Sequence, residues 1–266
     1  MTIAVIGLGD LGLACALRLR DTGCAVVGVD LSADRRAEWR QATGRQAVDG
    51  LRGLAIDRAF VCVRTTSQAH HVLGELQAHG GLAGDTDLAA YVVTTLEPAF
   101  ARGLAAYARD RFRVIELPVS GGRAAARAGE LTVLIGGDQA TAGDVEFVER
   151  TMARRTFAFP GFGDATLAKL LNNTVAAYNA AAFATCLALA DRAGLPADVC
   201  ADVIRVSSGG SWVAGNFEEL IGELLAKDVS LLAAEVGRLP AVELSDPGQL
   251  LTTLAHGVRL LAGRHE

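Results

Sequence analysis

The sequence is short of three features that mark large classes of proteins: basic charge, paired cysteines and clustered histidines. Lysine and arginine together (25) are outnumbered by aspartate and glutamate (30), which gives a net charge of −5. Nucleic-acid binding needs a basic stripe, so this balance argues against a polyanionic partner. Hydrophobic residues make up 51% of the chain, which is enough for a packed core. We therefore expect a globular protein without a nucleic-acid role.

The cysteines and histidines show no pattern of a disulfide framework or a metal site. Five cysteines are scattered through apolar contexts and form no CxxC pair: Cys15, Cys24, Cys62, Cys186 and Cys200. An odd, scattered set is typical of reduced core thiols, which predicts a cytoplasmic protein. The first residues run directly into a strand-like segment and do not resemble a secretory signal. The five histidines lack ligand spacing, so we predict no metal.

The longest apolar stretch, 167–190, has about the length of a membrane span. Lys169 and Asn173 interrupt it, and Asp191 bounds it. Polar side chains of this kind are rare in lipid, so the stretch predicts a buried helix of a globular domain and no membrane association.

The first part of the chain alternates short β-branched runs with alanine- and leucine-rich stretches. The predicted strands are 3–6, 25–29, 59–63, 91–95, 113–116 and 131–135. This alternation is typical of a doubly wound parallel sheet with helical crossovers, an α/β fold of the Rossmann type.

The pattern changes after Pro160. A long helix is predicted at 165–192, and further helices at 197–207, 217–239 and 247–262, so the last third is expected to be all-helical. We predict a dinucleotide-binding domain at 1–160 and a helical substrate and dimerisation domain at 161–266, joined by the long helix.

A glycine-rich loop follows the first predicted strand and opens the first helix. Its residues are Gly7, Leu8, Gly9, Asp10, Leu11 and Gly12. This is the context that the GxGxxG pattern requires: one glycine for the tight turn, one for approach of the pyrophosphate and one for close packing of helix on strand. The alternative is an ordinary glycine-rich turn. We predict a cofactor-binding loop.

The second predicted strand ends at Asp30, at the offset expected for a carboxylate that binds the ribose of NAD. A carboxylate would repel the 2′-phosphate of NADP, so Asp30 favours NAD. Arg35 and Arg36 follow in the next helix and offer cations to a 2′-phosphate, which leaves NADP open.

Three later segments resemble the β-hydroxyacid dehydrogenase family, of the 3-hydroxyisobutyrate dehydrogenase type, and cover most of the chain. Glu116-Leu117-Pro118-Val119-Ser120-Gly121-Gly122 is similar to its substrate loop, Lys169-Leu170-Leu171-Asn172-Asn173 to its catalytic-lysine segment, and Lys227-Asp228 to an element of its helical domain. The resemblance implies hydride transfer between NAD(P) and a small β-hydroxy acid or the corresponding carbonyl acid.

The resemblance also implies roles for single residues. Ser120, Gly121 and Gly122 would bind the substrate acid group, and a loop rich in free N–H groups suits a carboxylate. Lys169 would be the general acid or base, with Asn173 beside it on the same helical face, binding the substrate or orienting the lysine. Without the resemblance, Lys169 could simply extend to solvent.

Three further positions are expected on the cofactor. Thr95 resembles a family contact on the nicotinamide side, Lys227 resembles the helical-domain lysine that closes over the active site, and Arg64 follows the strand at 59–63. Arg123, directly after the substrate loop, departs from the family pattern. It would either bind a second anionic group of the substrate or lie on the surface.

Two other functions stay open on the sequence alone. An imine reductase shares the fold and the cofactor, and a non-catalytic dinucleotide sensor would need the glycine loop but not Lys169 with Asn173. The chain is too short for the phosphogluconate branch of dehydrogenases. The hydrophobic helical third is too small to bury all its faces, so we expect a homodimer or a higher homo-oligomer.

Overall fold

The computed structural model describes residues 1–79, 88–108, 112–239 and 247–262. The chain divides into two compact units, Met1–Glu235 and Val236–Glu266. All the site residues considered below belong to the first unit, and helix α11 (Pro247–Ala262) belongs to the second.

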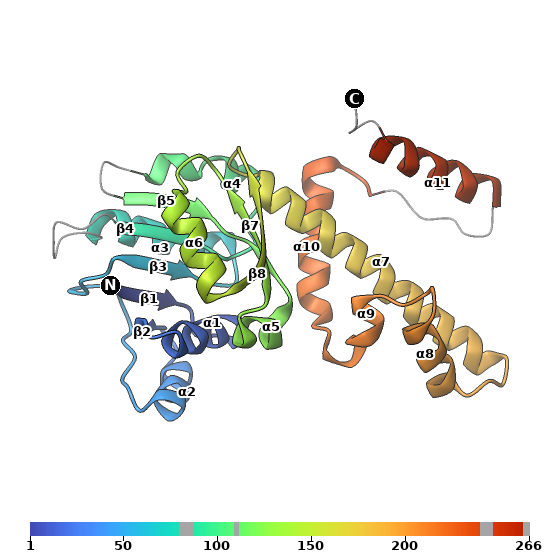
Figure 1. The fold of residues 1–266 in the computed structure, drawn as a ribbon, viewed down its shortest axis with the longest axis horizontal. Coiled ribbons are helices and arrows are strands. Elements are labelled where there is room, and N and C mark those ends of the chain that lie inside the picture. Colours follow the sequence, from blue (N-terminus) through green and yellow to red (C-terminus); the bar gives the residue numbers. More distant parts are fainter. Residues whose placement is uncertain (80–87, 109–111, 240–246, 263–266) are drawn as a thin grey trace. The chain divides into compact units, whose positions relative to one another are not determined.

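The first unit is built on one sheet with a parallel core (Figure 1). Its strands are β1 (Thr2–Ile6), β2 (Ala25–Val29), β3 (Arg58–Val61), β4 (Leu88–Val92), β5 (Phe112–Glu116), β6 (Val119–Ser120), β7 (Leu131–Gly136) and β8 (Ala153–Phe159). The order is β2-β1-β3-β4-β5-β7-β6, and β8 also pairs with β7. The expected doubly wound α/β fold is confirmed.

The sheet is mixed rather than wholly parallel. Strands β1 to β5 run parallel, but β7 is antiparallel to β5 and to β6, and β8 is parallel to β7. Strand β8 was not predicted because Arg154 and Arg155 interrupt its apolar pattern. Both are exposed at the sheet edge, where charged side chains are common.

Three of the four helices predicted in the last third are present with small shifts in their ends, whereas the predicted helix at 217–239 is divided into a short 3-10 turn and a separate α-helix. The helices that precede α11 are α1 (Asp10–Asp21), α2 (Ala33–Thr43), α3 (Thr66–His79), α4 (Pro98–Arg102), η1 (Leu104–Tyr107), α5 (Gly122–Ala128), α6 (Ala142–Thr151), α7 (Asp164–Arg192), α8 (Ala197–Val206), α9 (Trp212–Gly215), η2 (Phe217–Glu219) and α10 (Gly222–Val236). The boundary expected near Pro160 falls between β8 and α7, inside the first unit, and stays a prediction.

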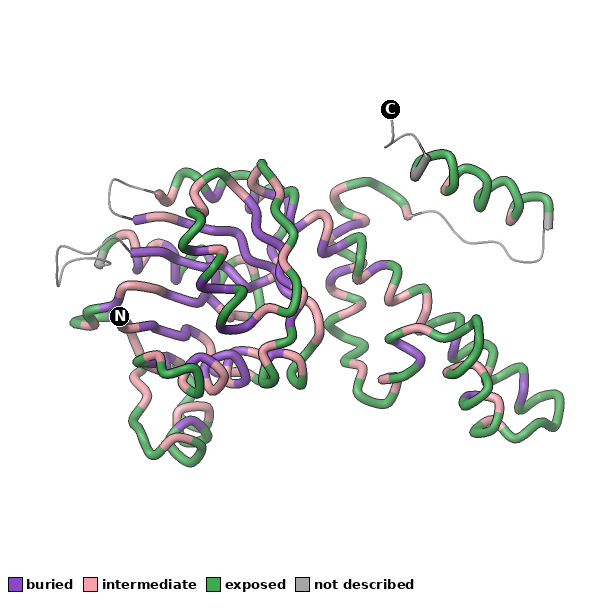
Figure 2. Tube along the Cα trace, in the orientation of Figure 1, coloured by how far each residue is buried: buried purple, intermediate pink, exposed green. Residues whose placement is uncertain are grey.

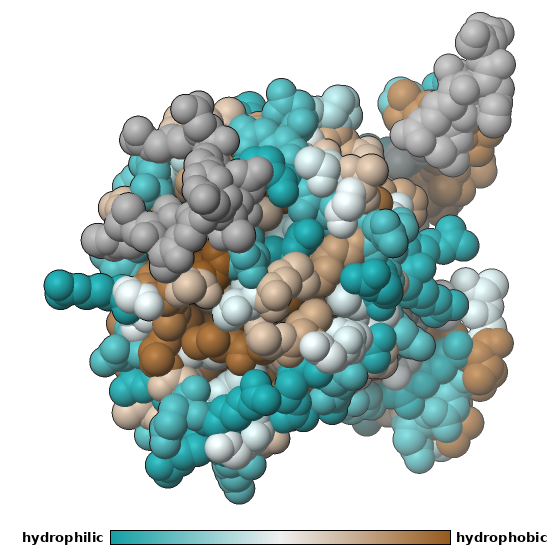
Figure 3. Space-filling model, turned by 60° about the vertical axis from the view of Figure 1, so that its left-hand side comes forward, coloured by the Kyte–Doolittle hydropathy of each residue, from teal (hydrophilic) through white to brown (hydrophobic). Residues whose placement is uncertain are grey.

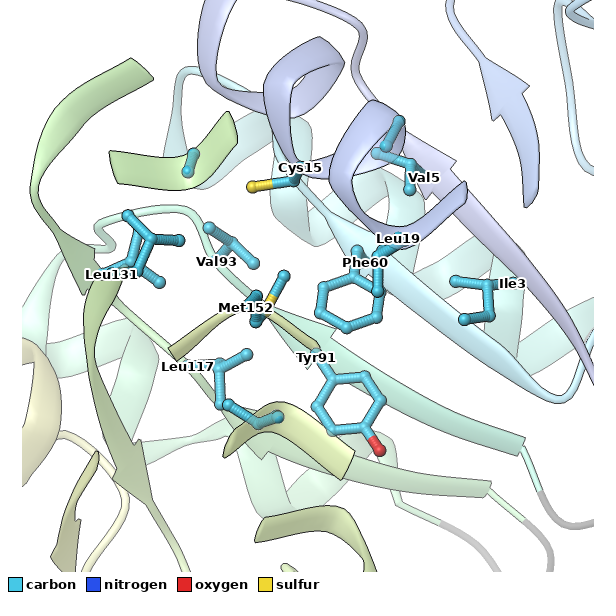
Figure 4. Packing of buried hydrophobic residues seen from close by; sticks show 14 of the residues in the cluster. Ile3, Val5, Cys15, Leu19, Phe60, Tyr91, Val93, Leu117, Leu131 and Met152 are labelled. Carbon is cyan, nitrogen blue, oxygen red and sulfur yellow. The ribbon is translucent and has the colours of Figure 1, made fainter. Parts of the chain in front are cut away.

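Each face of the sheet has its own buried apolar layer, because successive strand side chains point to opposite sides. Ile3 and Val5 pack with residues of α1 and α6, whereas Ala4 and Ile6 pack with residues of α3, α4 and η1. Figure 4 shows the first layer, in which the rings of Phe60 and Tyr91 stack at 4.7 Å between centroids. The sheet is therefore a rigid support covered on both sides.

Helix α7 begins in this core and then becomes exposed (Figure 2). It is the one helix among the described residues with the length and composition of a membrane span, with a mean hydropathy of 1.2, and 17% of that apolar stretch is buried. The expectation of a buried helix is therefore wrong for the single chain. Leu171, Val175 and Leu189 leave 52%, 57% and 48% of their surface exposed.

The face of the molecule drawn in Figure 3 is mostly hydrophilic, with a smaller area of apolar residues. Such a mixture is ordinary for a protein surface.

Candidate active site

The predicted cofactor and substrate positions of the sheet follow the carboxyl ends of its strands. Strands β1 to β4 run parallel and are followed by the glycine loop, Asp30, Arg64 and Thr95, and Ser120 ends β6 just after β5. In an open α/β sheet the ligand crevice lies outside this edge, where the strand order reverses. In this sheet the reversal falls at β1, which lies between β2 and β3.

The glycines of the first loop meet the demands of a dinucleotide loop. Gly7 has φ +93°, and a Cβ there would lie 2.5 Å from the carbonyl oxygen of Cys62; a Cβ at Gly12 would overlap the carbonyl oxygen of Gly7. A Cβ at Gly9 would meet nothing within 4 Å, so the space beside Gly9 is open. Two glycines thus allow close packing, and the third leaves room for a ligand to approach the backbone. The loop fits a dinucleotide.

The other loop residues have mixed surroundings. Leu8 is buried, and Leu11 is partly buried against the core. Asp10 is exposed and forms an ion pair with Arg35 at 3.3 Å. Leu8 and Leu11 are therefore committed to packing, and only their backbone groups can serve a cofactor.

Asp30 is fixed beside the glycine loop by two backbone donors. Its Oδ2 accepts from the N–H of Leu8 at 2.7 Å, and its Oδ1 accepts from the N–H of Ser32 at 2.8 Å. Each carboxylate oxygen retains a lone pair for another donor, such as a ribose hydroxyl.

The two nearby arginines are already engaged. Arg35 bonds Glu38 at 2.9 Å as well as Asp10, and Arg36 donates through Nη1 to the carbonyl oxygens of Asp30 and Leu31, both at 2.8 Å. A 2′-phosphate would have to compete with these partners.

Lys169 is buried in the second turn of α7, with 8% of its surface exposed. Burial lowers its pKa to about 8, and the neighbouring positive charge of Lys227 lowers it further, while the negative charge of Asp228 opposes the shift. Its amine is therefore present in both protonation states near neutral pH, which is what proton transfer in either direction requires.

Asn173 lies one turn beyond Lys169 and is held by a buried carboxylate. Its Nδ2 donates to Oδ2 of Asp228 at 2.6 Å, and Asp228 is 4% exposed. Lys227 forms an ion pair with Asp228 at 3.1 Å and donates to the carbonyl oxygen of Thr95 at 3.3 Å. Asp228 therefore links α10 to Asn173 of α7 by a hydrogen bond and acts on Lys169 through its charge, a role that its sequence position did not reveal.

Ser120, Gly121 and Gly122 form the turn from β6 into α5. Gly121 has φ +126° and Gly122 has φ +70°, conformations that glycine adopts without strain. Asn172 donates to Oγ of Ser120 at 3.5 Å, which joins the predicted substrate loop to helix α7. The sequence did not single out Asn172, although it lies between the predicted catalytic residues.

The two remaining predicted residues, Arg123 and Arg64, lie on the surface. Arg123 is exposed with no bond to the described residues, whereas Arg127, one turn on, forms an ion pair with Asp21 at 2.5 Å. Arg64 is exposed, and its backbone N–H donates to Gln68 at 2.9 Å. Among the described residues no group of three His, Cys, Asp or Glu side chains is arranged to hold a metal ion.

Lysine usage is a signal that sequence reasoning missed. Only Lys169 and Lys227 are lysines; arginine supplies every other cationic residue counted among the 25. Both lysines lie at this site, where an amine can lose its proton and a guanidinium cannot.

Comparison with known proteins agrees with this arrangement. Residues 2–161 match the model of the NAD-binding domain of 6-phosphogluconate dehydrogenase, and residues 163–242 match the NAD-binding model of NADP-dependent 3-hydroxyisobutyrate dehydrogenase. These matches, together with the relatives below, place the chain among the NAD(P)-binding oxidoreductases. The chain belongs to the β-hydroxyacid dehydrogenase family, as predicted.

Several similar proteins are named as dehydrogenases of small hydroxy acids. The NAD-dependent L-serine dehydrogenase of Pseudomonas aeruginosa is 33% identical over 79% of this chain and 71% of its own length. The L-threonate dehydrogenase of Escherichia coli is 31% identical over 80% and 72%. The crystal structure of 3-hydroxyisobutyrate dehydrogenase from Salmonella typhimurium matches with a TM-score of 0.78, at 25% identity over 97% of this chain and 95% of that one.

Proposed function

We propose that this protein is a dehydrogenase that moves a hydride between NAD and a small β-hydroxy acid or its carbonyl acid, with Lys169 as the general acid and base. The observation that carries the proposal is the burial of Lys169, with a pKa of about 8, beside Asn173, Asp228 and the substrate loop. A lysine kept partly neutral at a site of this kind has little purpose in a dinucleotide sensor.

The proton transfer follows from the protonation states of Lys169. In oxidation the neutral amine takes the proton of the substrate hydroxyl, and in reduction the ammonium gives a proton to the carbonyl oxygen. Asp228 stabilises the ammonium form by its charge, and it holds the amide nitrogen of Asn173. The amide oxygen of Asn173 accepts from Nδ2 of Asn172 at 3.1 Å and keeps a second lone pair for the substrate or the lysine.

The cofactor and the substrate acid would occupy different parts of the same edge. When bound, the nicotinamide dinucleotide supplies or accepts the hydride. Gly7, Gly9 and Gly12 would hold the pyrophosphate, and Lys227 and Thr95 would face the nicotinamide. Ser120 would bind the acid group, together with the backbone of the two following glycines.

We propose NAD over NADP because the fixed Asp30 carboxylate would repel a 2′-phosphate and because both nearby arginines have partners. The match of residues 163–242 to a model built on an NADP-dependent enzyme makes this choice a matter for measurement.

The substrate class is proposed from the relatives and from Arg123. L-Serine, L-threonate and 3-hydroxyisobutyrate are the acids named for similar proteins. Arg123 has no protein partner among the described residues, so a substrate with a second anionic group would gain from it.

The test is a turnover assay that follows NADH and NADPH absorbance with both cofactors. The panel contains the three acids above, a phosphonate acid and, in the reducing direction, cyclic imines. We expect turnover of at least one hydroxy acid, and loss of it in Lys169→Ala with unchanged NADH binding. Turnover of imines alone would favour an imine reductase, and tight cofactor binding with no turnover would favour a sensor.

We also propose a homodimer or higher homo-oligomer, located in the cytoplasm, where the five free thiols stay reduced. Apolar side chains of α7 and α8 are exposed, among them Val175 and Val203, each with 57% of its surface accessible. Sedimentation at micromolar concentration should give at least a dimer. A monomer throughout that range contradicts this part of the proposal.

A further inference from the structure

Glu116 is a buried carboxylate at the junction of the sheet and the catalytic helix. It ends β5 and is 1% exposed. Its Oε2 accepts from the N–H of Gly163 at 2.7 Å, and its Oε1 accepts from the N–H of Thr166 at 2.5 Å. These are two of the N–H groups at the start of α7 that have no partner within the helix.

The sheet is shaped to admit this carboxylate. Gly136 of β7 is the strand partner of Glu116, and a Cβ at Gly136 would overlap Oε2 of Glu116. Gly163, with φ +92°, turns the chain into α7 with its N–H directed at the same oxygen. Glycine at both positions gives the carboxylate a fixed seat.

The position of Glu116 is close in sequence to the substrate loop and, through its partner Thr166, to Lys169. Ser120 follows Glu116 by four residues along the chain, and Lys169 follows Thr166 by three residues, which is one helical turn. A single side chain thus ties the strand that leads to the substrate loop to the turn that precedes the catalytic lysine.

We propose that Glu116 is a positioning residue, which fixes the first turn of α7 so that the amine of Lys169 stays buried and faces the substrate loop. The inference rests on the proposed function of Lys169. It adds that the catalytic geometry depends on a carboxylate that touches neither cofactor nor substrate.

A purely structural role for Glu116 has a matched control in helix α6, which packs on the same sheet. Asp144 is also buried, at 2% exposed, and accepts from Arg58 at 2.8 Å, Arg113 at 2.5 Å and the hydroxyl of Tyr91 at 2.6 Å. It lies near the amino ends of the strands, away from the site. Asp144→Asn therefore removes a buried, bonded charge without touching α7.

Two variants disturb Glu116 in different ways. Glu116→Gln keeps the size of the side chain but turns a donor toward one of the two N–H groups. Gly136→Ala keeps the charge and displaces the carboxylate, and it also makes a second close contact at 2.9 Å on the Cβ of Ala165 in α7. Glu116→Gln is therefore the variant that isolates the carboxylate. A small displacement of a catalytic group commonly costs up to about 100-fold in rate, so we expect kcat to fall roughly 10- to 100-fold in both, with the Kd of NADH unchanged.

The deciding measurement is the titration of Lys169 by trace acetylation followed by mass spectrometry, in the wild-type protein and the three variants. With only two lysines in the chain, Lys227 serves as the internal reference. In Glu116→Gln and Gly136→Ala we expect the pKa of Lys169 to rise from about 8 toward that of an ordinary lysine, because water reaches the amine. In Asp144→Asn the pKa of Lys169 should stay unchanged.

The outcomes separate the two claims. If Glu116→Gln lowers only Tm, as Asp144→Asn does, with kcat and the Lys169 titration as in the wild type, the positioning role is wrong. If the wild-type protein turns over no substrate, the proposed function fails, but the acetylation series still decides whether Glu116 controls the surroundings of Lys169.

Discussion

The sheet and helix α7 use burial in opposite ways. Every residue of β4, Leu88–Val92, is buried, and the two faces of the sheet are closed by apolar layers. Helix α7 has 29 residues, and its buried positions concentrate in the first turns, where Lys169 is among them. Beyond those turns the helical region has a small core of Phe183, Ala201 and Ala214.

The difference indicates that the sheet stabilises the fold, whereas the start of α7 holds the reactive group. The sheet buries apolar groups, which stabilises the fold and fixes the loops at its carboxyl edge. The start of α7 buries an ionisable amine, which costs stability and gives that amine a pKa useful for proton transfer. The predictions below test whether the two regions differ in this way.

The largest effect on stability is expected in the sheet. Phe60 is fully buried and stacks on Tyr91, so Phe60→Ala should lower the free energy of unfolding by about 3–5 kcal/mol. In the smaller helical core, Phe183 packs on Phe217 with 5.0 Å between ring centroids. Phe183→Ala should lower the free energy of unfolding by less than Phe60→Ala does. Urea unfolding of both variants measures this. Equal losses would mean that the helical region is as tightly packed as the sheet.

The burial of Lys169 should appear as a stability penalty at neutral pH. Burial lowers its pKa from the usual 10.5 of a lysine to about 8, so the penalty is fully present below pH 8 and disappears as pH rises through 10.5. Lys169→Met should therefore be more stable than the wild type at pH 7, by up to about 3 kcal/mol, and lose this advantage near pH 11.

The control for that measurement is Lys227→Met, since the Lys227 side chain is 33% exposed. Because it removes the ion pair with the buried Asp228, it should lower stability at pH 7, the opposite sign to Lys169→Met. A wild-type protein as stable as Lys169→Met at pH 7 would mean that the amine of Lys169 is solvated.

Asp228 should tune the chemistry. Its negative charge raises the pKa of Lys169, so Asp228→Asn should move the pH midpoint of oxidation below about 8, and kcat should fall because Asn173 loses its acceptor. Glu235→Gln is the matched change, since Glu235 lies on the same helix and bonds the exposed Arg102 at 2.8 Å. An identical pH profile in Asp228→Asn would mean that Asp228 does not influence the protonation of Lys169.

The smallest effect is expected at the cofactor loop. Asp30→Asn keeps one acceptor and loses the charge, so NAD affinity should fall about 10-fold and the preference over NADP should weaken. Asp34→Asn removes the same charge from an exposed position on α2 and should change neither. Isothermal titration with both cofactors measures this, and a stronger NAD preference in Asp30→Asn would contradict the role of Asp30.

The sequence predicted those parts of the molecule that local patterns determine. The glycine loop directly follows a strand and opens a helix, and Asp30 ends the next strand, so both could be read from neighbouring residues. The resemblance to known dehydrogenases supplied Lys169 and Ser120, which composition and spacing alone leave ambiguous.

The remaining site contacts depend on residues far apart in the chain. Asp228 contacts Asn173 across 55 positions, and Glu116 bonds Gly163 across 47, distances at which a single sequence gives no pairing signal. The antiparallel direction of β7 and the existence of the charged edge strand β8 were not predicted for the same reason, because both depend on pairing with strands distant in the sequence.

The central claim is that Lys169 transfers the proton, and the pH dependence of kcat for hydroxy acid oxidation tests it most directly. The wild-type protein should show a rise in kcat with a midpoint near 8, because the neutral amine is the base, and Lys169→Ala should lose about 10²–10⁴-fold in kcat together with that rise. Near-normal turnover in Lys169→Ala, with the same rise, would contradict the account.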